Sequence, residues 1–94
     1  MKKIFKYKLE TTDLQQIEMP HGAEILCVQT QDEIPCIWAI VDPTANLVSR
    51  TFEIYGTGHD FTGLGWQDGR RRYVGTYQLR KGTLVFHCFE IEKS

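Results

Sequence analysis

The chain has 94 residues, which is the length of one domain spanning 1–94. Hydrophobic residues make up 41% of it and aromatic residues 12%, as in globular proteins, so an intrinsically disordered chain is excluded. The net charge of -1 argues against a nucleic-acid-binding protein, which usually carries a basic excess.

The amino-terminal residues alternate between apolar and charged side chains instead of forming an apolar run. Residues 3–10 therefore predict a half-buried strand and not a signal peptide. No stretch of the chain is long and apolar enough for a transmembrane helix, so we expect no membrane anchor. Residues 14–19 favour a second short strand, although Thr12 would also suit the cap of a single helical turn.

Two central segments, 24–29 and 34–42, are the strongest predicted strands. A short polar stretch separates them, which indicates a hairpin. Both segments are apolar on both faces, and such strands must be covered on both sides. We therefore expect a sandwich or a barrel, or a second subunit packed against one face. The small core of a chain of this size also favours a homo-oligomer.

Three further strands are predicted in the second half of the chain, at 49–55, 73–79 and 83–90. Gly75 lies inside one of them, which indicates a β-bulge or a close approach of another segment. Gly82 ends a hairpin turn that needs a positive φ angle. The pattern of the whole chain predicts an all-β fold, a small antiparallel sandwich or barrel of six to seven strands connected as a meander.

The candidate site is the long loop that follows the strand at 49–55. Five of the eight glycines lie between Gly56 and Gly69, and glycine lets successive backbone N–H groups converge on an anion. Arginine side chains would add charge-assisted hydrogen bonds to a phosphate, and a tryptophan would stack on a ring. The alternative is a flexible connection with solvated arginines. The predicted ligand-binding residues are Gly56, Thr57, Gly58, His59, Trp66, Arg70, Arg71 and Arg72.

The chain offers little for catalysis or metal binding. His59 and Asp60 suggest an acid–base pair, but adjacent residues rarely hydrogen-bond usefully, and a role in ordering the loop is the simpler interpretation. His87 and Cys88 point to opposite faces of a strand. The three cysteines have no Cys-x-x-Cys spacing and predict reduced core residues of a cytoplasmic protein. We therefore expect no enzyme, no metal and no cofactor.

Several segments resemble a family of short, uncharacterised phage and prophage proteins. The similarity covers most of the chain and includes the segment Ile54-Tyr55-Gly56-Thr57-Gly58-His59; the other similar segments are residues 3–7, 35–39 with 41–43, 74–77 and 84–87. The resemblance implies an accessory protein of a mobile element, acting in the cytoplasm of a bacterial host. Proteins of that kind often act by binding, either to a host defence protein or to a nucleotide signal.

Two functions follow from these features. In the first, a homo-oligomer sequesters an anionic, nucleotide-like ligand through the glycine- and arginine-rich loop and so counters host defence. In the second, the chain is a protein–protein interaction module that inhibits a host defence protein through an exposed apolar or aromatic sheet face.

Overall fold

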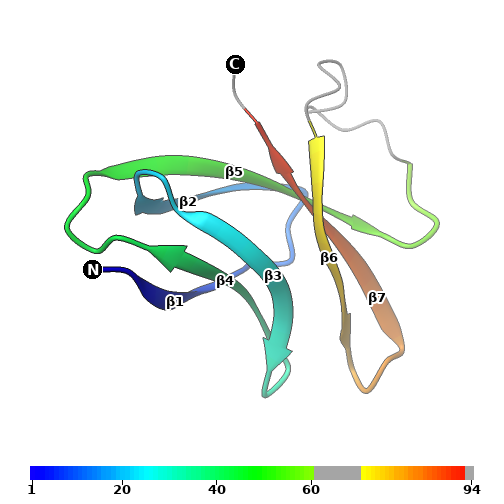
Figure 1. Ribbon diagram of the computed structural model, residues 1–94. Coiled ribbons are helices and arrows are strands. Elements are labelled where there is room, and N and C mark those ends of the chain that lie inside the picture. The colour runs from blue at the N-terminus through cyan, green and yellow to red at the C-terminus, as the bar shows by residue number, and fades with distance from the viewer. Residues whose placement is uncertain (61–70, 93–94) are drawn as a thin grey trace.

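The computed structural model describes residues 1–60 and 71–92, and in these residues it contains seven β-strands and no helix (Figure 1). The all-β prediction is therefore confirmed, and so is the strand at 14–19 over the alternative of a helical turn. None of the described residues forms a helix that could cross a membrane. The strands are β1 (Lys3–Lys8), β2 (Leu14–Pro20), β3 (Glu24–Gln31), β4 (Ile34–Val41), β5 (Leu47–Gly56), β6 (Arg71–Leu79) and β7 (Leu84–Ile91).

The strands form two antiparallel sheets that pack as an open sandwich and do not close into a barrel. One sheet has three strands in the order β1-β4-β3, and the other has four in the order β2-β5-β7-β6. Figure 1 shows the long β5 passing above β1 and β4, with β6 and β7 to one side. The hairpins β3–β4 and β6–β7 are consecutive, whereas β1 and β2 pair with the more distant strands β4 and β5.

The core lies between the inner faces of the two sheets. On β4 the inner side chains are Ile37, Ala39 and Val41, each no more than 1% exposed. Phe52 on β5 and Cys88 on β7 face them from the four-stranded sheet, and both are fully buried. Every second residue of a strand points to the same face, so these positions carry the period of two that the sequence predicts.

β6 begins earlier than the sequence suggested. We expected the loop to run through Arg72 and the strand to start at Tyr73. Arg71 and Arg72 instead belong to β6, where they pair with Ile91 and Glu90 of β7. Charged residues can extend a strand when neighbouring strands carry side chains of opposite charge. Glu53 on β5 and Glu90 on β7 are the acceptors for these two arginines.

Gly75 meets both expectations for a glycine within a strand. The register of β6 shifts between Tyr73 and Gly75, which marks a bulge, and a Cβ atom at Gly75 would lie 2.8 Å from Cγ1 of Val28 on β3. This contact brings the edges of the two sheets together, because β3 and β6 touch without being hydrogen-bonded neighbours.

Replacing Gly75 with alanine is expected to lower the free energy of unfolding by about 1–3 kcal/mol, because the added methyl group overpacks the buried Val28. Urea denaturation measures the change. The double variant Gly75→Ala/Val28→Ala makes room for the methyl group, so its loss should be smaller than the sum of the two single losses. Additive losses would show that the close approach does not limit this position.

Candidate binding site

The loop predicted as the site starts with a tight turn after β5. The N–H of His59 donates to the carbonyl oxygen of Gly56 at 3.1 Å, and the N–H of Thr57 donates to that of Val85 at 3.1 Å. Gly58 has a φ angle of +88°, which favours glycine. Two backbone donors of the predicted anion site are therefore used within the protein.

His59 lies over Gly56. A Cβ atom at Gly56 would be 2.7 Å from both Cε1 and Nδ1 of the imidazole, so a larger residue here would displace the exposed His59 ring. The His59 side chain therefore packs against the turn to which His59 belongs. Next to this turn is a hollow of about 220 Å³ lined by Gly56, Thr57, His59, Thr83, Leu84, Val85 and Phe86.

The arginines of the predicted site have different surroundings. Trp66 and Arg70 lie outside the described residues. The side chain of Arg71 is 6% exposed and forms an ion pair with the buried Glu53, with 2.9 Å between Nε and Oε1. Its Nη2 also donates to the hydroxyl of Tyr55 at 3.2 Å, and its guanidinium lies 5.5 Å from the centre of that ring.

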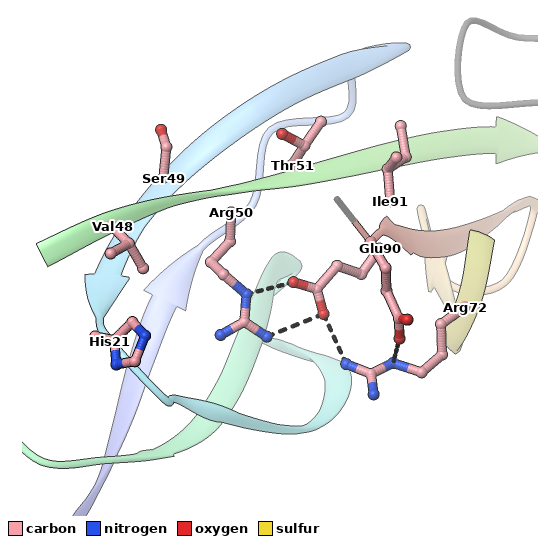
Figure 2. A pocket seen from close by; sticks show the side chains of 9 residues that line it. His21, Val48, Ser49, Arg50, Thr51, Arg72, Glu90 and Ile91 are labelled. Atoms are coloured by element: carbon pink, nitrogen blue, oxygen red, sulfur yellow. Dashed lines mark hydrogen bonds and ion pairs between the residues drawn. The ribbon is translucent and has the colours of Figure 1, made fainter. Parts of the chain in front are cut away.

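Arg72 belongs to a charged cluster on the other side of the four-stranded sheet (Figure 2). Glu90, whose side chain is 4% exposed, accepts hydrogen bonds from both Arg50 and Arg72. Nη2 of Arg72 lies 2.9 Å from Oε1 of Glu90, and Nη2 of Arg50 lies 3.1 Å from the same oxygen. Nη1 of Arg50 donates to the carbonyl oxygen of Ala23 at 2.8 Å, and Nε of Arg72 pairs with Glu92 at 3.3 Å.

This cluster lines a pocket of about 530 Å³. Figure 2 shows Arg50, Glu90 and Arg72 in a row, with His21 on the far side of Arg50. Two guanidinium groups face two carboxylates, so the formal charges of the four groups cancel. Arg72 is the more accessible arginine, with 55% of its side chain exposed. The other lining residues are Val48, Ser49, Thr51 and Ile91.

The sequence contained a signal for this pocket that we did not use. Arg50 has the same strand parity as the core residue Phe52, and Glu90 the same parity as the core residue Cys88. A period of two therefore places one cation and one anion on the apolar face. Charged groups that are buried are usually paired, so the two side chains could have been matched to each other before the strand order was known.

His87 and Cys88 point to opposite faces of β7, as expected. Cys88 is fully buried in the core, and burial, with a smaller contribution from the charge of Glu90, raises the pKa of its thiol to about 12. His87 lies on the outer face between two hydroxyl groups, with Nε2 2.7 Å from Thr57 and Nδ1 3.0 Å from Thr76. Cys88 is therefore a core residue shielded from solvent.

No group of three or more histidine, cysteine, aspartate or glutamate residues that could hold a metal ion occurs within 1–60 and 71–92.

The outer face of the three-stranded sheet is apolar along its centre. Ile4 of β1 lies opposite Ile40 of β4, and the bulge in β3 sets Leu26 and Cys27 against Trp38. Ile4 is 62% exposed and Leu26 is 44% exposed. We call the set Ile4, Leu26, Ile34, Trp38 and Ile40 the outer apolar face.

Lysine and tryptophan meet on this face. Nζ of Lys6 lies 5.9 Å from the centre of the Trp38 ring, a distance at which a cation is attracted to the face of an indole. Nε1 of Trp38 is buried and has no hydrogen-bond partner within residues 1–60 and 71–92. A buried indole N–H normally has an acceptor, so this donor is an exception in the described part of the chain.

The fold defines a small β protein of two packed antiparallel sheets. The whole chain, residues 1–94, matches the model of the family "Domain of unknown function (DUF7352)", and the protein belongs to that family. No curated protein and no solved structure matches the chain.

Proposed function

We propose that the protein acts by binding another protein through its outer apolar face. The observation that carries the proposal is the composition of β4, whose outer side chains are as apolar as the inner ones but less buried: Trp38 and Ile40 are only partly buried, and Ile34 is 46% exposed. A sheet with two apolar faces needs cover on both. Among the described residues, the inner face of β4 is fully buried and the outer face is covered only in part.

The residues of this face suit an interface. Tryptophan and large aliphatic side chains contribute most of the binding free energy at the centres of protein interfaces. Trp38 lies at the middle of the face, and Ile4, Leu26 and Ile34 surround it with exposed apolar surface. A partner that covers the face would remove this apolar surface from water.

The resemblance to phage and prophage proteins suggests the class of the partner. In this proposal it is a protein of the bacterial host, bound in the host cytoplasm, and the binding inhibits a host defence function. No chemical step is required of the chain, so the protein is not an enzyme. The homo-oligomer expected from the small core remains a prediction, which sedimentation equilibrium of the purified chain would test.

The experiment compares charge insertions on two exposed apolar positions with equal exposure. Ile4 on the outer apolar face and Leu47 at the start of β5 are both 62% exposed. We expect Ile4→Glu to weaken binding to a stoichiometric partner isolated from host lysate about tenfold or more, and Leu47→Glu to leave it unchanged. Leu26→Glu should behave like Ile4→Glu. If all three variants bind as well as the wild type, the outer apolar face is not the interface.

Binding of an anionic, nucleotide-like ligand is the second candidate function. It is favoured by the charged pocket, where Arg72 is half exposed at one end and the exposed His21 lies at the other. The arginines already pair with Glu90 and Glu92, so an anion would have to compete with these carboxylates. For this reason we rank the ligand below the protein partner.

A panel of mono-, di- and cyclic nucleotides tests this candidate by thermal stabilisation. A bound ligand should raise the melting temperature of the wild type, and Arg72→Ala should abolish the rise. In the same assay Gly58→Ala and His59→Ala report on the predicted loop site. No stabilisation by any member of the panel would contradict the candidate.

A further inference from the structure

We propose that β1 is an open edge to which an acidic, extended segment of the partner protein adds as an antiparallel strand. This inference rests on the proposed function, because it names the kind of segment with which the partner reaches the outer apolar face. It makes the partner strand a fourth strand of the three-stranded sheet, in a position next to Ile4.

The sheet topology singles out β1. The two sheets have four edge strands, and two of them, β3 and β6, lie against each other through the contact of Gly75 with Val28. β2 is the third edge and ends at Pro20, which cannot donate a backbone hydrogen bond. β1 contains no proline and has a hydrogen-bonded neighbour, β4, on one side only. Its other side offers backbone donors and acceptors to an added strand.

The positive charge of the β1 edge determines which kind of strand can add to it. Lysine occupies positions 2, 3, 6 and 8, so four of the first eight residues are cationic. Among the described residues, an ion pair joins Lys8 to Glu10 at 3.9 Å between two side chains that are 67% and 64% exposed, and Nζ of Lys6 donates a hydrogen bond to Oε1 of Gln31 on β3. A pair so exposed leaves most of the positive charge of the edge available to a partner.

The same lysines disfavour a second copy of the chain at this edge. If β1 paired with β1 of another copy about a two-fold axis at Lys6, Lys6 would lie opposite Lys6 of the copy. Like charges directly opposite each other destabilise a strand pair. A partner strand that carries carboxylates opposite the lysines would form favourable charge pairs. The charge of β1 therefore disfavours pairing with a second β1 and favours an acidic partner strand.

The two faces of β1 specify the partner strand residue by residue. Lys6 and Lys8 point to the outer face beside a hollow of about 270 Å³, whose other lining residues are Gln31, Asp32, Ile34 and Cys36. Ile4, 62% exposed, and Phe5, 37% exposed, favour apolar residues opposite them. Read from Lys8 to Lys3, the complementary strand is acidic, polar, acidic, apolar, apolar, acidic.

The test uses the whole isotope-labelled protein and a blocked synthetic peptide, Glu-Thr-Glu-Ile-Val-Glu, which has this pattern. We expect amide shifts concentrated in 3–8 and in the adjoining β4. A peptide of the same composition in the order Ile-Val-Thr-Glu-Glu-Glu should bind at least tenfold more weakly. Methylation of the backbone nitrogens that face β1 should weaken binding by a similar factor, because it removes hydrogen bonds and leaves the charge unchanged.

The matched protein variant is Lys6→Glu/Lys8→Glu, since both side chains are exposed and the fold should tolerate the exchange. This variant should bind the acidic peptide at least tenfold more weakly and should bind Lys-Thr-Lys-Ile-Val-Lys better than the wild type does. Equal binding of the N-methylated peptide, or shifts located on β2 or in the charged pocket, would overturn the proposal. If the peptide fails while Ile4→Glu and Leu26→Glu still abolish binding of the lysate partner, edge addition is wrong and the proposed function stands.

Discussion

Replacing Glu90 with alanine is expected to lower the free energy of unfolding by about 3–5 kcal/mol. The carboxylate is 4% exposed and is the shared acceptor of Arg50 and Arg72. Without it Arg50, whose side chain is 19% exposed, keeps only its bond to the carbonyl oxygen of Ala23 and becomes a poorly solvated, unpaired cation. A domain of this length is stable by roughly 5–14 kcal/mol, so the loss is a large part of the total.

Urea denaturation of a matched set of variants separates the buried pair from the surface pair. Glu92→Ala removes the other carboxylate that binds Arg72, at a side chain that is 52% exposed, and should cost less than about 1 kcal/mol. The double variant Arg50→Met/Glu90→Leu replaces both charges with apolar groups and should recover most of the loss of Glu90→Ala. If Glu90→Ala costs no more than Glu92→Ala, the cluster does not stabilise the fold.

The strands were predictable because a period of two is a local signal. In β1 and β5 the alternation of side chains can be read directly, β4 is a continuous apolar run, and the hairpins β3–β4 and β6–β7 follow from short polar turns. The order of the strands in the two sheets was not predictable. β1 pairs with β4 and β2 with β5, and no short-range feature encodes which distant strands become neighbours.

The residues of the candidate site could be predicted even less well, because their contacts depend on the strand order. Read along the chain, Arg71 and Arg72 form one basic run that suits an anion. On a strand, adjacent residues point to opposite faces, so Arg71 meets Glu53 and Arg72 meets Glu90. The partners lie 18 residues away in both cases, one before and one after the run. The alternation could have been predicted, whereas the identity of the partners depends on the strand order.

Stability should fall above about pH 9, because the buried thiol of Cys88 keeps its proton in the folded protein and loses it in the unfolded chain. Burial, and secondarily the charge of Glu90, raises the pKa of Cys88 from 9.0 to about 12. Between these two values the folded state binds more protons than the unfolded state, so the free energy of unfolding decreases as the pH rises. The loss from this group approaches about 4 kcal/mol by pH 12, since each pKa unit corresponds to roughly 1.4 kcal/mol.

The measurement is a series of urea titrations from pH 8 to pH 10.5 on the wild type and on Cys88→Ala. Both proteins contain the same lysines and tyrosines, so the contributions of these groups to the pH dependence largely cancel in the comparison. Tyr77 is one of them, and its pKa is also raised by burial. Alanine costs some packing at every pH but cannot ionise. The stability difference between the two proteins should therefore shrink by about 2 kcal/mol across the series. Parallel pH profiles would mean that the thiolate is accommodated in the folded core, against the burial that Cys88 shows between the two sheets.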